Sequence, residues 1–186
     1  MGPDAHTIRA MRELKPFNFK RWIDEHRHLL KPPVGNKQVF TDSEFIIMVV
    51  GGPNSRKDFH VDPGEEFFYQ LEGGITLATI QDNRRVDIPI HEGEIFLLPP
   101  NMPHSPRRPA NTVGLVIERQ RVEGEKDHLR WFCENCGEVL HDDAFQLEDL
   151  GKQLKPIIEN FYQNETLRTC RNCGHVMKVP QPAAKK

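Results

Sequence analysis

Long apolar runs and a strong excess of charge of either sign are both absent from this 186-residue chain. The longest apolar stretch, residues 45–50, has the length of a strand. It is far short of the roughly 20 residues that a helix needs to cross a bilayer. The formal net charge is −2, so overall charge favours neither nucleic acid nor an anionic membrane as a partner. Residues 1–17 carry charges throughout and lack the apolar core of a secretory signal, so we expect a cytoplasmic location.

Cysteine is also scarce, with four residues in the chain. A chain of this length can bury a hydrophobic core without a disulfide framework. Thiols in the cytosol are kept reduced, so the four cysteines are expected to bind metal rather than to form disulfides. The content of 37% apolar and 28% charged residues is that of a globular protein and not of a disordered one.

A short amphipathic helix is predicted near the start of the chain, over residues 18–30. Apolar and aromatic side chains recur there at helical spacing, and a pair of prolines ends the pattern. The residues concerned are Phe19, Trp22, Ile23, His26 and Leu30, followed by Pro32 and Pro33.

Between residues 38 and 122 the sequence consists of short runs rich in Val, Ile, Phe and Leu. The runs are EFIIMVVGG, EEFFYQLEGG, ITLATIQD, RRVDIPIHEGE, IFLLPPNMPHS and TVGLVIERQ. Gly, Pro, Asn or Asp bounds each of them. Regularly spaced short strands with turn signals predict a mainly β protein, an antiparallel jelly-roll barrel.

The pattern changes again after residue 122. Residues 148–163 have helical periodicity with a break near Pro156, and they separate two Cys-x-x-Cys-Gly motifs. We therefore expect a barrel domain with its N-terminal helix over residues 1–126. A small C-terminal appendage, with a helix and a metal site, is expected over residues 127–186.

The two cysteine motifs have the spacing of a zinc-ribbon or rubredoxin-like site. Each motif lets two thiolates bind one tetrahedral metal, and the glycine that follows permits the tight turn. The four ligands are Cys133, Cys136, Cys170 and Cys173. A redox dithiol needs only one such motif and is the weaker interpretation. Four thiolates leave no open position, so we expect a structural site that holds zinc or iron. His175 is not needed as a ligand.

Two further segments, HVDPGEEFFYQLEG and GEIFLLPPNMPH, resemble the paired motifs of the cupin superfamily. The resemblance implies metal ligands at His60, Glu66 and His104. Asp62 stands where many cupins have a second histidine, which leaves two histidines and one carboxylate. This is the facial triad of non-haem ferrous oxygenases, with open positions for substrate and dioxygen. Six other histidines are expected to have only structural or surface roles: His6, His26, His28, His91, His128 and His141.

The strings PPVGN, HVDPGEEFFYQLEG, IFLLPPNMPHSPRRP and GLVIERQR more closely resemble the family of 3-hydroxyanthranilate 3,4-dioxygenases. The resemblance implies an Fe(II)-dependent extradiol-type ring cleavage of 3-hydroxyanthranilate with O₂ to 2-amino-3-carboxymuconate semialdehyde. That product closes to quinolinate, in NAD biosynthesis or tryptophan breakdown. The resemblance also assigns substrate-binding roles to five residues: Asn36, Arg56, Glu66, Arg108 and Glu118. Glu118 would also be the catalytic acid–base residue.

The residues themselves leave some alternatives open. Arginine suits a carboxylate because its planar fork binds both oxygens. Arg56 could instead be a surface charge in a loop, and Arg107 is expected to be a solvated surface arginine. Glu118 lies in an apolar strand, so it either faces outward or is a tuned general base.

Two rival functions remain, a non-catalytic ligand-binding cupin and a cupin dioxygenase for another aromatic carboxylate. We expect a homodimer, because barrels of this type commonly pair.

Overall fold

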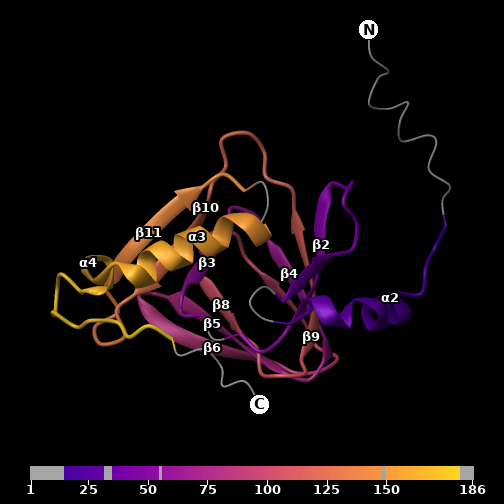
Figure 1. The fold of residues 1–186 in the computed structure, drawn as a ribbon, viewed down its shortest axis with the longest axis horizontal. Helices are drawn as coiled ribbons and strands as arrows, with labels where there is room; N and C mark the ends of the chain where they lie inside the picture. The colour runs from indigo at the N-terminus through magenta and orange to yellow at the C-terminus, as the bar shows by residue number, and fades with distance from the viewer. Residues whose placement is uncertain (1–14, 32–34, 55, 148–149, 181–186) are drawn as a thin grey trace, which may run out of the picture.

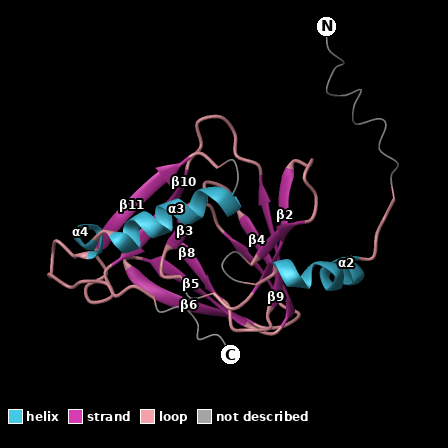
Figure 2. Cartoon of the chain, viewed as in Figure 1, coloured by secondary structure: helices cyan, strands magenta, loops and turns pink. Residues whose placement is uncertain are grey.

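A computed structural model describes residues 15–31, 35–54, 56–147 and 150–180 of the chain. Strands dominate it (Figure 2). They form two antiparallel sheets, one of five strands in the order β1-β2-β9-β4-β7 and one of six in the order β11-β10-β3-β8-β5-β6. The predicted mainly β architecture is therefore confirmed. None of the described helices is long and apolar enough to cross a membrane.

The five-stranded sheet consists of β1 (Asn36–Gln38), β2 (Phe45–Gly51), β9 (Val113–Arg119), β4 (Glu66–Glu72) and β7 (Ile95–Leu98). The six-stranded sheet consists of β11 (Val139–Phe145), β10 (Asp127–Phe132), β3 (Phe59–Val61), β8 (His104–Arg107), β5 (Ile75–Gln81) and β6 (Arg84–Ile90). The run IFLLPPNMPHS, read as one segment in the sequence, contributes β7 to the first sheet and β8 to the second.

The main core lies between the two sheets, because alternate residues of each strand point inward. In β4, for example, Glu66, Phe68 and Gln70 are buried while their neighbours are partly exposed. The apolar residues of this core come from both sheets: Ile46, Met48, Phe68, Ile75, Leu77, Ile90, Leu98 and Val116.

The helices cover two separate surfaces of this sandwich (Figure 1). Helix α2 (Phe19–His26) begins at Asn18, whose side chain accepts a hydrogen bond from the Arg21 backbone N–H at 2.8 Å. The chain continues as a 3₁₀ turn, η1 (Arg27–Leu29), so the regular helix is shorter than predicted. Its buried residues pack with β2 and β9 in a cluster of Ile23, Leu30, Val49 and Val113.

Helix α3 (Leu150–Gln163) and the short α4 (Glu165–Arg168) lie beside β10 and β11 (Figure 1). The predicted C-terminal helix is thus present, with Pro156 inside it. A third cluster of buried side chains joins α3 to β10: Leu129, Trp131, Phe161 and Met177.

Strand β10 connects the two segments that the sequence analysis separates at residue 126. It pairs with β3 of the barrel on one side and with β11 on the other. The appendage therefore continues the six-stranded sheet. The division at residue 126 itself stays a prediction.

Candidate metal centre and substrate site

Three side chains from three strands meet inside the sandwich. His60 of β3 and His104 of β8 are direct partners in the six-stranded sheet, and their ring centroids are 5.2 Å apart. Glu66 begins β4 in the other sheet, because the turn after Asp62 carries the chain across. One ligand atom from each of the three residues lies within 4.8 Å of the other two. The predicted triad is thus brought together in space.

The Glu66 carboxylate and the His104 imidazole are in direct contact. Glu66 Oε2 lies 2.7 Å from His104 Nε2, and both side chains are buried. His104 Nδ1 is 3.0 Å from the Met102 carbonyl oxygen and donates to it, so the neutral imidazole carries its lone pair on Nε2. A carboxylate oxygen and an imidazole nitrogen that lie this close to each other can bind one cation together, and imidazole and carboxylate are ligands for iron. The donor set therefore fits a metal ion.

The imidazole of His60 is oriented by a buried carboxylate. His60 Nε2 lies 2.7 Å from Asp127 Oδ2, and Asp127 is fully buried in β10. Although burial works against it, hydrogen bonds from Arg121 and His60 lower the pKa of Asp127 to about 2. An ionised Asp127 makes Nε2 the donor, which leaves Nδ1 with a lone pair. Carboxylates in this position fix the tautomer and orientation of metal-binding histidines.

Arg121 is the centre of the acidic cluster next to these ligands. Its Nη2 atom lies within 2.6–2.9 Å of carboxylate oxygens of Asp62, Glu118 and Asp127. All four side chains are almost completely buried. Neither Arg121 nor Asp127 lies in a sequence pattern that predicts a role for it. The run GLVIERQR contains Arg121, but no local pattern indicates that it binds three carboxylates.

Glu118 faces inward, which removes the outward-facing alternative. It is 3% exposed and lies directly opposite Glu66 in the β4–β9 pairing. Burial and repulsion from Glu66 raise its pKa well above the usual range, although Arg121 opposes both. A buried carboxyl with a raised pKa can accept a proton from a bound phenol near neutral pH. Its catalytic role stays a prediction.

The two predicted carboxylate-binding arginines have different surroundings. Arg56 is partly exposed, and its guanidinium pairs with both oxygens of the buried Asp58 at 3.0 and 2.5 Å. Arg108 is 3% exposed, and its Nε has no hydrogen-bond partner among the described residues. Burial lowers the pKa of Arg108 to about 10, with Glu66 opposing, so it is still charged at neutral pH.

The loop of Arg56 is attached to the segment of Arg108. The Asn54 side chain donates to the Pro106 carbonyl at 3.0 Å, and the Asn54 backbone N–H donates to the Arg108 carbonyl at 2.9 Å. Arg107 is half-buried near Arg85 and Asp87, so the prediction of a fully solvated arginine was wrong.

Asn36 lies in β1 at the edge of the five-stranded sheet, where it pairs with Val50. Within the described ranges, no contact joins it to the metal ligands or to the two arginines. Its role stays a prediction.

The four cysteines converge as predicted. Sγ atoms of the two motifs are 3.6 Å apart in the pairs Cys133–Cys173 and Cys136–Cys170. Metal–sulfur bonds of about 2.3 Å imply tetrahedral sulfur–sulfur distances of about 3.8 Å, whereas a disulfide requires about 2.05 Å. The distances thus fit a tetrahedral metal site and no disulfide.

Amide groups support the two exposed thiols of this site. Asn135 Nδ2 donates to Cys173 Sγ at 3.5 Å, and Asn172 Nδ2 donates to Cys136 Sγ at 3.6 Å. The Asn135 hydrogen bond lowers the pKa of Cys173 to about 6. Gly137 and Gly174 both have positive φ, at 77° and 73°, which explains why a glycine follows each motif.

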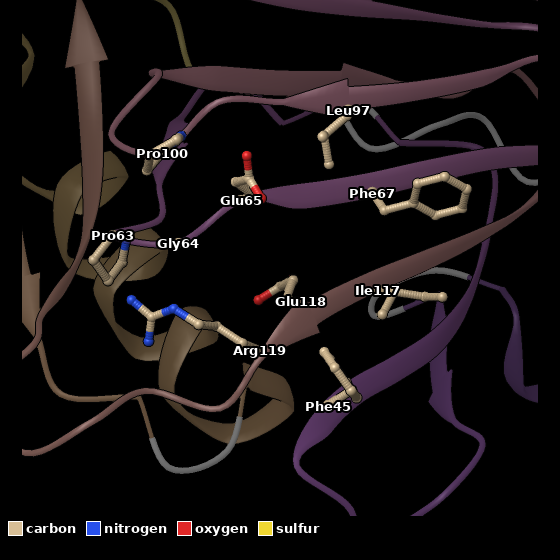
Figure 3. Close-up of a pocket in the computed structure, with 10 residues that line it drawn as sticks. All are labelled: Phe45, Pro63, Gly64, Glu65, Phe67, Leu97, Pro100, Ile117, Glu118 and Arg119. Atoms are coloured by element: carbon tan, nitrogen blue, oxygen red, sulfur yellow. The ribbon is translucent and has the colours of Figure 1, made fainter.

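A cavity of about 410 Å³ lies at the surface next to the turn between β3 and β4 (Figure 3). Its residues are Phe45, Pro63, Gly64, Glu65, Phe67, Leu97, Pro100, Ile117, Glu118 and Arg119. Several of them belong to the outer face of the five-stranded sheet. Glu118 is the member that also belongs to the carboxylate cluster beside the triad. The cavity therefore reaches the edge of the metal site at Glu118.

Comparison with known proteins gives consistent matches over most of the chain. A family model described as 3-hydroxyanthranilic acid dioxygenase matches residues 11–162. The 3-hydroxyanthranilate 3,4-dioxygenase of Jannaschia sp. is 53% identical over 173 residues, which are 92% of this chain and 96% of the relative. The enzymes of the same name from Ruegeria pomeroyi and Bacillus cereus (strain 03BB102) are each 50% identical. They cover 92% and 88% of this chain, and 96% and 92% of their own lengths.

Solved structures match more distantly. A cupin-2 domain protein from Shewanella frigidimarina has a TM-score of 0.44 at 17% identity, over 56% of this chain and 94% of that one. Hydroxypropylphosphonic acid epoxidase from S. wedmorenis has a TM-score of 0.33 at 16% identity, over 40% of this chain and 41% of that one.

Proposed function

Because the chain belongs to the 3-hydroxyanthranilic acid dioxygenase family, we propose that it cleaves the ring of 3-hydroxyanthranilate with O₂ at the centre formed by His60, Glu66 and His104. Family membership confirms the resemblance found in the sequence motifs, and the chain is a ring-cleaving dioxygenase. The metal and the residues that carry the reaction are our proposal.

Ferrous iron is the metal that suits this centre best. Two imidazoles and one carboxylate on one face leave open positions, and the ligands are harder than thiolates. When bound, ferrous iron would supply the activation of O₂ and coordinate the phenol oxygen and the amine of the substrate. The contributions of the protein are the orientation of His60 by Asp127 and of His104 by the Met102 carbonyl.

Substrate orientation is assigned to the arginines and to Glu118. The guanidinium of Arg108, which has no carboxylate partner among the described residues, would bind the ring carboxylate of the substrate. Arg56 would donate to the same carboxylate from its loop. Glu118, buried beside Glu66, would accept the phenol proton. Precise placement of these groups relative to the substrate supplies much of the rate enhancement in such enzymes.

The proposed product follows from the insertion of both oxygen atoms between ring carbons 3 and 4. Addition of O₂ to 3-hydroxyanthranilate gives 2-amino-3-carboxymuconate semialdehyde with no other reactant. The amine of this product then condenses with its aldehyde carbon, and loss of one water gives quinolinate. We expect this activity to serve NAD biosynthesis or tryptophan breakdown.

The observation that carries the proposal is the convergence of the three ligand atoms, above all the 2.7 Å contact between Glu66 and His104. The test is anaerobic reconstitution with Fe(II), followed by O₂ uptake and product absorbance with 3-hydroxyanthranilate. His104→Ala should bind less iron and consume no O₂. If the iron-loaded wild-type protein binds the substrate without O₂ uptake, it is a ligand-binding cupin. If O₂ is consumed only with another aromatic carboxylate, that compound and not 3-hydroxyanthranilate is the substrate.

The four-cysteine site is proposed to hold iron or zinc in a purely structural role. Tetrahedral thiolate sites suit both metals. Use of four reduced cysteines as ligands also supports the proposed cytoplasmic location.

We propose a homodimer formed through the outer face of the five-stranded sheet. Ile47, Ile117, Phe67 and Leu97 are aligned across β2, β9, β4 and β7 and face outward. Helix α2 covers the neighbouring part of this face but not this row. Leu97 remains 55% exposed. A sheet face in water is normally polar, so an apolar row indicates a partner, and two-fold symmetry lets one patch cover its copy.

The oligomeric state is measured by light scattering after gel filtration. Leu97→Asp should convert a dimer to a monomer that keeps its iron. A wild-type monomer at micromolar concentration would contradict the dimer without affecting the proposed reaction.

A further inference from the structure

Arg108 is a buried arginine of the barrel with no ion pair to a carboxylate among the described residues. Within the described ranges its guanidinium makes one hydrogen bond, from Nη1 to Gln70 Oε1 at 3.4 Å. Arg56, Arg119 and Arg121, by contrast, each pair directly with at least one carboxylate. A buried charge without a counter-charge is costly, so its retention needs an explanation.

The orientation of Gln70 is set by two backbone carbonyls. Its Nε2 donates to the Glu72 carbonyl at 3.0 Å and to the Val113 carbonyl at 3.1 Å, and the side chain is buried. Rotation of the amide by 180° would place its oxygen against both carbonyl oxygens. Oε1 therefore points at Arg108, where it offers a neutral acceptor in place of a negative charge.

Gly114 leaves the space in which Arg108 and Gln70 meet. It is the direct partner of Gln70 in the β4–β9 pairing. A Cβ atom at this position would lie 2.9 Å from both Arg108 Nη1 and Gln70 Oε1. Any larger residue would have to displace one of the two polar groups.

This arrangement lies one aromatic ring away from the metal ligands. Glu66, Phe68 and Gln70 alternate along the inner face of β4, so Phe68 separates the metal-binding end from the Gln70 end. The Phe68 ring centroid is 6.2 Å from that of His104. Four strand residues span about 13 Å. A benzene ring whose carboxylate points away from the metal would bridge this distance together with the arginine side chain.

We propose that Gln70 is a specificity-determining residue. It holds the Arg108 guanidinium in place without neutralising it, which keeps that charge available to the ring carboxylate of the substrate. This inference rests on the proposed function and deepens it. The site selects an aminophenol that carries a carboxylate over the same aminophenol without one, and the neutrality of residue 70 causes the selection.

The test compares two ligands that differ only in the carboxylate. Dissociation constants of 3-hydroxyanthranilate and 2-aminophenol are measured anaerobically on the iron-loaded enzyme, wild type and Gln70→Glu. Glu is nearly isosteric with Gln and would pair with Arg108. We expect binding of 3-hydroxyanthranilate to weaken about 10- to 100-fold, the range for loss of a charge-assisted hydrogen bond. Binding of 2-aminophenol should change less than about 2-fold.

Two further variants separate charge from structural damage. Gln70→Met removes the acceptor and adds no charge, so it should retain the preference for the carboxylated ligand within a few-fold. Gln81→Glu makes the same substitution in β5, where Gln81 donates to Thr79 at 3.0 Å and is far along the chain from Arg108, and should leave both constants unchanged.

An unchanged ratio of the two constants in a Gln70→Glu enzyme that keeps its iron and its melting temperature overturns the inference. Equal losses for both ligands, or equal effects of Gln70→Met and Gln70→Glu, overturn it as well. Failure of the wild-type enzyme to bind or oxidise 3-hydroxyanthranilate would instead contradict the proposed function.

Discussion

His60 and Asp127 are joined by a 2.7 Å contact between Nε2 and Oδ2, although 67 residues separate them in the sequence. The contact exists because β10 pairs with β3, where Leu129 is the direct partner of His60. Asp127 lies two residues from Leu129 on the same face of the sheet, so it is the diagonal neighbour of His60. A residue of the predicted appendage thereby orients a proposed metal ligand of the barrel.

Replacement of Asp127 by Asn should weaken iron binding. The amide cannot fix the tautomer of His60 as a carboxylate does, and loss of such partners typically costs 10- to 100-fold in metal affinity. The measurement is Fe(II) affinity by competition with a chelator.

Asp142 provides a matched control for this prediction. It accepts from His128 at 2.8 Å in an exposed His–Asp pair of the same type. Asp142→Asn should retain wild-type iron affinity. Equal iron affinity in Asp127→Asn and wild type would remove Asp127 from the metal centre.

Glu118→Ala is expected to keep its iron and lose most of its turnover. General-base catalysis contributes about 10²- to 10⁴-fold, so kcat should fall within that range. Iron content and melting temperature serve as controls for folding. Full activity in an iron-loaded Glu118→Ala enzyme would exclude this residue from proton transfer.

The pH profile gives an independent measurement of Glu118. A base acts only when it is deprotonated, so kcat/KM should rise as the pH rises through its pKa. Because burial raises that pKa, the rise should occur above the pH at which an exposed glutamate ionises, about 4.3. Glu118→Gln should lack this limb. Persistence of the same limb in the variant would assign it to another group.

The parts of the site that could be predicted are those carried by local motifs. His60 and Glu66 fall within seven residues of one motif, and the four cysteines lie in two repeats of another. Arg121, Asp127 and Gln70 were missed because strand pairing places them. Asp127 meets His60 when β10 pairs with β3, Gln70 lies opposite Gly114 when β4 pairs with β9, and Arg121, which follows β9, meets Asp62 only in the folded chain.

Strands β1, β3 and β10 lie outside the apolar runs by which strands were predicted, for similar physical reasons. Strands β1 and β3 have three residues each, too few for a period of two to be visible. In β10 the inward positions are Asp127, Leu129 and Trp131, so a charged residue interrupts the apolar alternation. That aspartate is the residue that contacts His60. The residue with the proposed functional role is therefore the one that interrupts the pattern by which a strand is predicted.

Cys170→Ser should remove the metal of the cysteine site and lower the melting temperature. Cys170 is buried and would be one of four tetrahedral ligands, and structural sites of this type contribute directly to folding. Metal content by elemental analysis should fall by one equivalent while the barrel keeps its iron. Asn135→Ala, which removes only a hydrogen bond to Cys173, should retain both metals. Unchanged metal content and melting temperature in Cys170→Ser would refute the structural role.

Phe161→Ala should destabilise the protein by about 3–5 kcal/mol, the range for deletion of a buried aromatic side chain. The Phe161 ring stacks on Trp131 with centroids 4.1 Å apart and planes 13° from parallel, and both side chains are fully buried. This cluster joins α3 to β10, whose Leu129 pairs with His60.

Urea unfolding followed by tryptophan fluorescence measures the change in the free energy of unfolding. Val122→Ala removes an exposed side chain and should change it by less than about 0.5 kcal/mol. If Phe161→Ala costs no more than that control, the cluster does not hold α3 against the sheet. If it does reach the expected range, the variant should also bind Fe(II) less tightly, because β10 carries Asp127 to His60.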